Sequence, residues 1–386
     1  MIGDMIVSIV VYSLTALILY VLAQDMARKD KRSLKVKGVH SPMWTSSFVL
    51  SIFAFALVAG MRYNTGVDHL SYLESYLHGG NDTNEQGFYV LSHFMSSLGL
   101  HYFFYFAFWA ALQIMFIYLG CKYRRELLPF IALSIMLGPY FLNWMNGIRQ
   151  TLVECFFVAI IAYYCNNKSL KSLIISAVLI FAASFIHRSS VILLALLFLA
   201  MINIPLNNKF VNIAAVVVCL VIGSTPYWIT MNSGGVSDLL VLLGYDHYSM
   251  TYEEMVEMAD FRETAFGPLR LMTLFVDLCI IWFYPKIEEV YSSDKALGPF
   301  FQFFFFGVCA YNLFANTNIL FLRPVEYLTI FRLPMTAYLL CYLKRANKTW
   351  FVVVCFFVFT YTLVEVLKSG LLGVKETNLY HFFFFQ

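Results

Sequence analysis

Charged residues are scarce in this chain. Only 13% of its 386 residues are Asp, Glu, Lys or Arg, 60% are hydrophobic, and the mean hydropathy is +0.72. Soluble globular domains carry roughly a quarter charged residues. The shortage therefore excludes a soluble globular domain and indicates an integral membrane protein.

Other absences narrow the class of protein further. The eight cysteines lie in apolar segments or beside basic loops without metal-ligand spacing, so neither a disulfide framework nor a zinc site is expected. No internal repeat is visible, which weakens the case for a transporter built from duplicated halves. No basic segment interleaved with aromatic residues predicts nucleic-acid binding.

Long apolar runs fill most of the chain. Because a helix rises about 1.5 Å per residue, about 20 apolar residues cross a hydrocarbon core of about 30 Å. The sequence predicts about twelve such helices, near residues 4–23, 43–61, 101–120, 127–145, 149–165, 170–186, 190–204, 209–231, 268–285, 298–320, 324–343 and 349–368. We expect an all-α polytopic membrane protein with one domain, residues 1–386.

Short basic loops predict the orientation, because Lys and Arg accumulate on the cytoplasmic side. The segment ARKDKRSLKVK follows the first helix, and the loops 121–126, 166–172, 206–209, 285–295 and 343–348 fall on its side. The N-terminus and the loops 62–100 and 232–267 are then external. The first apolar run lacks a basic leader, which favours an uncleaved anchor over a signal peptide. The segment 87–100 is too short to span comfortably, so we expect an interfacial or re-entrant helix there.

Several charged residues on the expected external side are not topology signals. A single arginine at a helix end usually extends to lipid headgroups, but several on different helices favour an anion site. Arg323 and Arg332 are nine residues apart and would point to opposite faces of a regular helix, so Arg323 is the favoured site residue. Glu154 lies inside a span and should face the interior, with Gln150 one turn away.

Four ordered elements resemble the EpsG-like branch of the Wzy-type bacterial polysaccharide polymerases. They are R-x-x-x-G-x-D-x-x-x-Y (Arg62, Gly66, Asp68, Tyr72), E-x-G-[FY] (Glu85, Gly87, Phe88), N-x-[IL]-R-Q (Asn146, Ile148, Arg149, Gln150) and H-x-S (His187, Ser189), followed by a late Arg-x-x-x-Tyr (Arg323, Tyr327). The resemblance covers residues 60–345. Arg188 follows His187, where many relatives have another residue.

The resemblance implies a glycosyltransferase of the bacterial cytoplasmic membrane, GT-C-like in architecture and acting on the periplasmic or extracellular face. It would join undecaprenyl-pyrophosphate-linked oligosaccharide repeat units into an O-antigen, capsule or exopolysaccharide. Donor and acceptor lipids and the surrounding membrane are then the partners, and a chain-length regulator and a flippase are further candidates. A lipid-linked oligosaccharide flippase or other transporter, an acyltransferase and an O-antigen ligase are the alternatives.

The residues suit this chemistry. Guanidinium groups match the oxygens of a pyrophosphate leaving group, and substrate binding is assigned to Arg62, Tyr72, Asn146, Arg149, Gln150, Arg188, Arg323 and Tyr327. A carboxylate or imidazole can accept the proton of the acceptor hydroxyl, which makes Asp68, Glu85 and His187 the candidate bases.

Asp68 is the favoured base, because Gly66 permits a tight turn beside it; an ion pair of Asp68 with Arg62 is the alternative interpretation. The carboxylates are scattered along the sequence, so we expect no metal and no other cofactor.

Overall fold

A computed structural model describes residues 2–79, 85–202, 204–224, 267–315, 319–373 and 376–385. Within these ranges the regular elements are helices, apart from an isolated β-bridge between Arg62 and Phe382. The predicted all-α class is therefore confirmed. The predicted external loop 232–267 lies outside the described residues, except for its last position.

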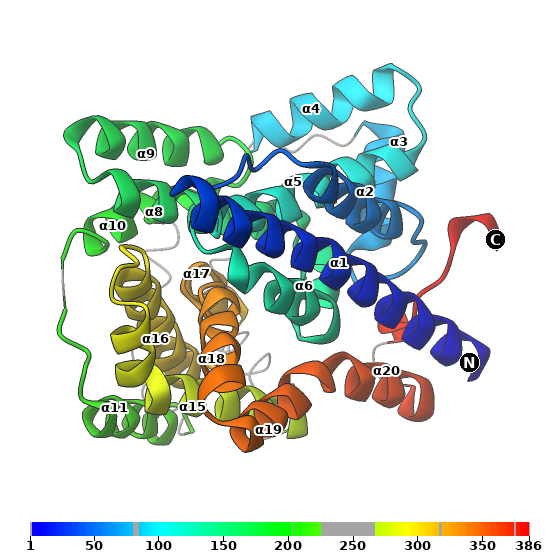
Figure 1. Cartoon of the computed structure of the whole chain (residues 1–386). Coiled ribbons are helices and arrows are strands. Elements are labelled where there is room, and N and C mark those ends of the chain that lie inside the picture. The colour runs from blue at the N-terminus through cyan, green and yellow to red at the C-terminus, as the bar shows by residue number, and fades with distance from the viewer. Residues whose placement is uncertain are drawn as a thin grey trace.

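The helices follow one another closely along the chain (Figure 1). The N-terminal part contains α1 (Ile2–Lys37), α2 (Ser46–Gly60), α3 (His69–His78), α4 (Gln86–Ser97), α5 (Tyr102–Gly120), α6 (Leu128–Leu137), α7 (Tyr140–Asn146), α8 (Ile148–Asn167), α9 (Leu170–Ala183), α10 (Ile192–Leu199) and α11 (Lys209–Gly223). The C-terminal part contains α15 (Pro268–Val290), α16 (Leu297–Phe314), α17 (Ile319–Thr329), α18 (Arg332–Ala346), α19 (Lys348–Phe359) and α20 (Tyr361–Leu372). Short 3₁₀ turns lie at Arg125–Leu127, Arg188–Val191, Glu376–Asn378 and Phe383–Phe385.

Six helices of the described residues are long and apolar enough to cross a membrane. They are Ile2–Lys37, Tyr102–Gly120, Ile148–Asn167, Pro268–Val290, Leu297–Phe314 and the continuous pair Lys348–Leu372. A seventh is added if the bent pair α6 and α7 counts as one span. The protein is a helical membrane protein, but the expected count of twelve spans is not confirmed. The reason is length: α2, α9 and α11 are apolar helices of 15, 14 and 15 residues.

Proline and glycine account for the places where expected spans are interrupted. The axes of α6 and α7 differ by 63° across Gly138 and Pro139. A residue before proline is pushed out of the helical region, and Gly138 is extended with φ −95° and ψ −166°. Pro334 has no N–H to bond the carbonyl of Ile330, and the chain breaks between α17 and α18 at that point. Gly147 likewise separates α7 from α8.

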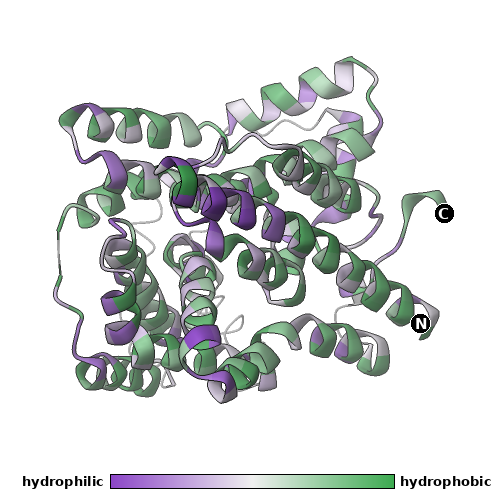
Figure 2. Cartoon of the chain, in the orientation of Figure 1, coloured by the Kyte–Doolittle hydropathy of each residue, from purple (hydrophilic) through white to green (hydrophobic). Residues whose placement is uncertain are grey.

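The helix α1 is longer than a membrane is thick. Its 36 residues extend about 54 Å at 1.5 Å per residue, against a hydrocarbon core of about 30 Å. It packs on α2 and α6. Figure 2 shows that its C-terminal half is hydrophilic, whereas the surrounding helices are mostly apolar. That half can therefore lie at the level of lipid headgroups.

A small aromatic core holds α3 and α4 on the bundle. Tyr76 stacks on Tyr105, and Phe88 stacks on Trp109, with ring centroids 4.5 and 4.7 Å apart. These contacts join α3 and α4 to α5, and Ile148 at the start of α8 belongs to the same cluster. A helix over 87–100 is confirmed, since α4 occupies Gln86–Ser97. At 12 residues it is only about 18 Å long, too short to cross a bilayer.

The C-terminal segment, residues 377–383, forms backbone hydrogen bonds with the loop that follows α2. The N–H of Tyr63 donates to the carbonyl of His381 at 2.8 Å, and that of Gly66 donates to Thr377 at 2.7 Å. The N–H of Phe383 donates to the Met61 carbonyl at 3.0 Å. These bonds fix the backbone that leads to Asp68 and so position one side of the site described next.

Candidate functional site

A cavity of about 560 Å³ lies where the ends of several helices meet. Its lining comes from α3, α7, α8, α15, α16, α17, α18 and α20, from the turn before α3, and from the segment after α9. Seven residues predicted from the sequence line it: Asp68, Tyr72, Asn146, Arg149, Gln150, His187 and Arg323. Four others, Arg62, Glu85, Arg188 and Tyr327, are not part of its wall. The fold thus gathers most of the predicted residues at one place.

Glu85 lies outside the cavity lining and contacts two of the lining residues, His187 and Arg149. One carboxylate oxygen, Oε1, pairs with Nδ1 of His187 and accepts the backbone N–H of Arg188 at 3.2 Å. The other oxygen, Oε2, forms an ion pair with the Arg149 guanidinium. Glu85 is buried. The carboxylate thus orients His187 and Arg149, and the imidazole Nε2, which is itself buried, is left without a hydrogen-bond partner among the described residues.

Gly87 explains how Glu85 reaches His187. The N–H groups of Gly87 and Phe88 both donate to the Phe185 carbonyl, at 2.8 and 3.2 Å. A Cβ atom on Gly87 would lie 2.9 Å from both the Cβ and the carbonyl oxygen of Phe185. Only glycine allows the start of α4 to approach this backbone so closely. The E-x-G-F element is therefore a docking contact between α4 and the segment after α9.

The turn that carries Asp68 depends on Gly66 and Asn146. Gly66 has φ +96°, and the Asn146 Oδ1 accepts the N–H of Val67 at 2.6 Å. A Cβ on Gly66 would lie 2.8 Å from that Oδ1 atom. Asp68 precedes α3 but makes no side-chain capping hydrogen bond. Its carboxyl group is consequently able to face a ligand in the cavity.

Two opposing effects act on the pKa of the Asp68 carboxyl group. The side chain is exposed, yet the surrounding protein removes enough water to raise the pKa of its carboxyl above the usual value. The positive charges of Arg323 and Arg149 oppose this rise. Asp68 therefore lies within electrostatic reach of both arginines. It does not pair with Arg62, so the alternative of an Arg62–Asp68 ion pair that fixes the loop is not what the structure shows.

Arg62 is turned into the protein instead. Its Nη1 donates to the carbonyls of Thr65 at 2.9 Å and Met145 at 3.0 Å, and its guanidinium lies 4.8 Å from the ring centre of Phe106. It is only 2% exposed. These contacts connect the loop after α2 to the end of α7, and they favour a structural role over the ligand contact expected from the sequence.

Glu154 and Glu326 add two carboxylates that the sequence did not assign to the site. Both line the cavity. The Gln150 Nε2 donates to Glu154 Oε1 at 3.0 Å, to Glu326 Oε2 at 2.6 Å and to the Arg323 carbonyl at 2.9 Å. The expectation that Glu154 faces the interior and finds a partner is confirmed. Gln150 acts as a bridge between α8 and α17, and it fixes Arg323 near the cavity.

Arg323, the favoured residue, lines the cavity, and Arg332 lines it as well, contrary to the expectation that a regular helix would point the two to opposite faces. That expectation assumed one regular helix, whereas α17 ends at Thr329 and α18 begins at Arg332. The proposed start at Pro324 is also incorrect, because Pro324 lies inside α17. Arg332 donates to Asp277 through Nε at 2.6 Å and Nη2 at 2.9 Å. This bidentate pair offsets its charge.

The two remaining predicted residues, Tyr327 and Arg188, do not line the cavity but contact residues next to it. Tyr327 is fully buried, and its hydroxyl shares a 2.7 Å hydrogen bond with the Ser189 hydroxyl. Arg188 contributes its backbone N–H to Glu85, and its side chain is exposed. The H-x-S and late R-x-x-x-Y elements are therefore joined to each other. Their contact places the segment after α9 against α17.

The cavity lining combines charged groups with aromatic rings. Three arginines and three carboxylates contribute, together with the rings of Tyr72, Tyr140, Trp144, Tyr311 and Tyr361. Guanidinium groups bind phosphate oxygens, carboxylates bind hydroxyl groups, and aromatic faces pack on apolar C–H surfaces. In the described part of the chain no three His, Cys, Asp or Glu residues come together as a metal site. The lining suits a ligand with both a phosphate and a sugar part.

The fold and the cavity define a helical membrane protein with a polar, arginine-containing site at the ends of its helices. The family model described as EpsG family matches residues 46–381. The chain therefore belongs to the EpsG family, and membership indicates a role in polysaccharide polymerisation, a glycosyltransferase-type activity. The elements on which the resemblance rested lie within the matched region. Comparison with curated proteins and with solved structures finds no match.

Proposed function

We propose that the protein polymerises undecaprenyl-pyrophosphate-linked oligosaccharide repeat units, and that the cavity is where one unit is transferred to the next. The observation that carries this proposal is the joint placement of Arg149, Arg323 and His187 in one cavity. A lipid-linked sugar pyrophosphate needs cations at the leaving group and a proton acceptor at the attacking hydroxyl. The arginines and the candidate proton acceptor line the same cavity.

The leaving pyrophosphate is bound by Arg149 and Arg323. Guanidinium groups match phosphate oxygens in planar pairs of hydrogen bonds. Arg332 is a positioning residue, because its Nε and Nη2 both donate to the buried Asp277, whereas the ion pair of Arg149 with Glu85 is made through Nη1. As the bond from the anomeric carbon to the pyrophosphate oxygen breaks, the growing negative charge is stabilised by the guanidinium groups of Arg149 and Arg323.

The acceptor hydroxyl is activated by His187. Glu85 holds Nδ1, which favours the tautomer with the proton on Nδ1 and the lone pair on Nε2. The acceptor oxygen attacks the anomeric carbon, its proton moves to Nε2, and the pyrophosphate leaves as an anion. Asp68 binds the acceptor sugar through its hydroxyl groups. Of the three bases expected from the sequence, Glu85 is then an orienting group and Asp68 a binding group.

The cavity is external in this proposal. Arg332 at the start of α18 lines it, whereas Lys344 near the other end of α18 belongs to a basic loop expected to be cytoplasmic. Twelve residues of helix separate the two by about 18 Å. That length is shorter than a hydrocarbon core of about 30 Å, so the external placement rests on the positions of the basic loops and not on α18 alone. A GT-C-like architecture and a location in the bacterial cytoplasmic membrane belong to the same proposal.

Transfer without a metal ion is also proposed. Neutralisation by arginine and proton transfer to His187 supply the two requirements of the reaction from the chain itself. Polymerisation in the presence of a chelator is expected to proceed at the untreated rate. Loss of activity on chelation, with recovery on addition of Mg²⁺ or Mn²⁺, would refute this part.

The experiment that tests the function uses purified protein in lipid with a defined undecaprenyl-pyrophosphate repeat unit. A ladder of products longer by whole repeat units supports the polymerase. Translocation of the substrate without a new glycosidic bond would instead identify a flippase. Transfer only to an added lipid A core acceptor would identify a ligase.

A further inference from the structure

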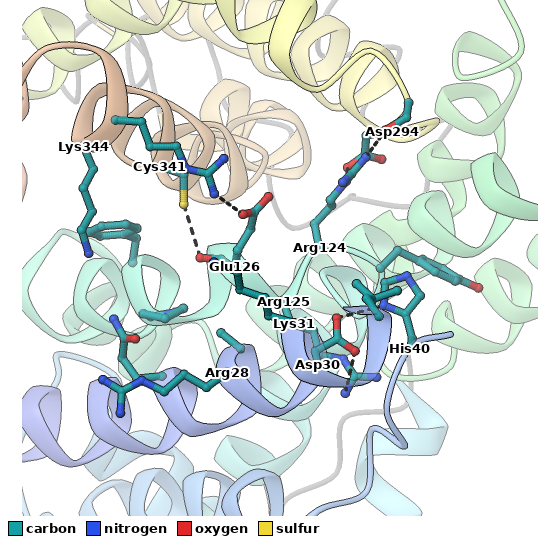
Figure 3. A pocket seen from close by; sticks show the side chains of 18 of the residues that line it. Arg28, Asp30, Lys31, His40, Arg124, Arg125, Glu126, Asp294, Cys341 and Lys344 are labelled. Carbon is teal, nitrogen blue, oxygen red and sulfur yellow. Dashed lines mark hydrogen bonds and ion pairs between the residues drawn. The ribbon is translucent and has the colours of Figure 1, made fainter. Parts of the chain in front are cut away.

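A second cavity of about 840 Å³ lies among the basic segments, remote from the family elements. The C-terminal half of α1, the turn at Arg125–Leu127 with the start of α6, the loop between α15 and α16, and the end of α18 form its walls (Figure 3). None of the residues assigned to the glycosyl-transfer cavity lines it. It is therefore a separate site.

Its acidic residues are already neutralised within the fold. Asp294 accepts from Arg124 Nε at 2.9 Å, and Glu126 pairs with Arg345 at 2.5 Å. The remaining carboxylate, Asp30, accepts the Ser41 N–H at 2.9 Å and lies 3.6 Å from Arg125. Each carboxylate in the lining thus has a cation of its own.

Three further cations in the lining have no such partner. Arg28 and Lys31 lie three residues apart on α1, so they share one helix face. Lys344 reaches the cavity from α18. All three are exposed, and none forms a hydrogen bond or an ion pair within the described residues. Arg28 is within electrostatic reach of Asp25, which itself pairs with Lys29, so the cavity carries a net positive charge from two separate helices.

The lining also includes apolar surface beside these cations. Leu34, one turn after Lys31 on α1, is 40% exposed, and Phe130 of α6 lies 5.6 Å from the Lys344 ammonium. Free phosphate would need only the cations, whereas a lipid presents a phosphate next to glycerol and acyl carbons. The long, hydrophilic end of α1 places this combination at headgroup level.

We propose that this cavity binds the phosphate headgroup of an anionic phospholipid from the leaflet on the side of the basic loops. Arg28, Lys31 and Lys344 hold the phosphate, and Leu34 contacts the glycerol region. Each cation near a membrane surface strengthens such binding roughly fivefold, so the three together account for about a hundredfold. Binding should also weaken as salt is added, because the cations are exposed.

The test measures the thermal unfolding midpoint of the purified full chain in neutral detergent during titration with short-chain phosphatidylglycerol. Phosphatidylcholine of the same chain length and inorganic phosphate are the parallel titrations. The variant Arg28→Gln/Lys31→Gln/Lys344→Gln removes the three cations of the cavity. The variant Arg32→Gln/Lys35→Gln/Lys37→Gln removes the same charge from exposed positions of α1 that do not line it.

We expect phosphatidylglycerol to raise the midpoint of the wild type and of the control variant, and the cavity variant to need about a hundredfold more lipid. Equal responses of the two variants, or no response to any titrant, would overturn the site. An equal response to inorganic phosphate, or to phosphatidylcholine, would overturn the assignment to an anionic lipid.

Discussion

The Nδ1 atom of His187 pairs with the Oε1 atom of Glu85, which lies 102 positions earlier in the chain. This contact connects the helix α4 to the segment after α9, and it leaves Nε2 as the nitrogen that can take a proton. Because Glu85 also holds Arg149, one buried carboxylate orients a candidate base and a candidate phosphate ligand together. A change at Glu85 should therefore disturb both groups.

Replacement of His187 by Gln is expected to lower kcat by about 10²–10⁴, the usual contribution of a positioned general base. The KM for the lipid-linked donor should change little, because the arginines remain. Glu85→Gln should also lower kcat, since the carboxylate that fixes the tautomer is lost. Initial rates of product-ladder formation measure both variants. Wild-type kcat in His187→Gln would show that another group accepts the proton.

Asp68 is expected to produce an acid limb in the pH profile. Burial raises the pKa of its carboxyl, so the group is protonated at pH values where an ordinary aspartate is already charged. If the carboxylate binds the acceptor, activity rises with pH through this raised pKa and is lost below it. Asp68→Asn should be slower and should lack this limb. An unchanged acid limb in Asp68→Asn would assign it to a different residue.

Gly87→Ala should impair activity although it lies outside the cavity. The added Cβ would meet Phe185 at 2.9 Å and push the start of α4 away, which separates Glu85 from His187. A displacement of about 1 Å at a catalytic group can cost about 10²-fold in rate. Gly298→Ala is the matched control, because a Cβ added at Gly298 would meet no atom within 4 Å. Equal activity of the two variants would contradict the docking role of Gly87.

Asp277 and Arg332 should show strong coupling in a double-mutant cycle. Asp277→Asn or Arg332→Gln alone leaves one buried charge without its partner, which typically costs about 3–5 kcal/mol. The double variant removes both charges and should lose much less than the sum of the single losses. Thermal unfolding midpoints in detergent report the three variants. Additive losses would mean that the pair does not hold α15 and α18 together.

The sequence predicted the helical membrane class and seven of the residues that line the cavity, because apolar runs and outward arginines are local signals. The assembled contacts were harder to predict. Arg323 was favoured over Arg332 by assuming one regular helix, although Pro334 gives a physical reason for a break. Arg62 was assigned to the ligand, but its burial depends on the C-terminal segment and on α7. Glu154 and Glu326 meet at Gln150 only because α8 and α17 pack together, which no local pattern indicates.

The expected number of spans is not confirmed for a related reason. Hydropathy finds apolar segments, but it does not report where a helix stops. The expected span 43–61 becomes a helix of 15 residues, Ser46–Gly60, and 170–186 becomes one of 14, Leu170–Ala183. The segments were found correctly, and their helices are shorter than the apolar runs.

Glycosyl transfer in the cavity that contains Arg149 can be tested by following two products at once. The measurement records release of undecaprenyl pyrophosphate together with ladder formation, from a defined lipid-linked repeat unit, in the wild type and in Arg149→Ala. We predict one pyrophosphate lipid released for each new glycosidic bond in the wild type, and a joint loss of both products in the folded variant. Full ladder formation and full release in Arg149→Ala would contradict the assignment of this cavity.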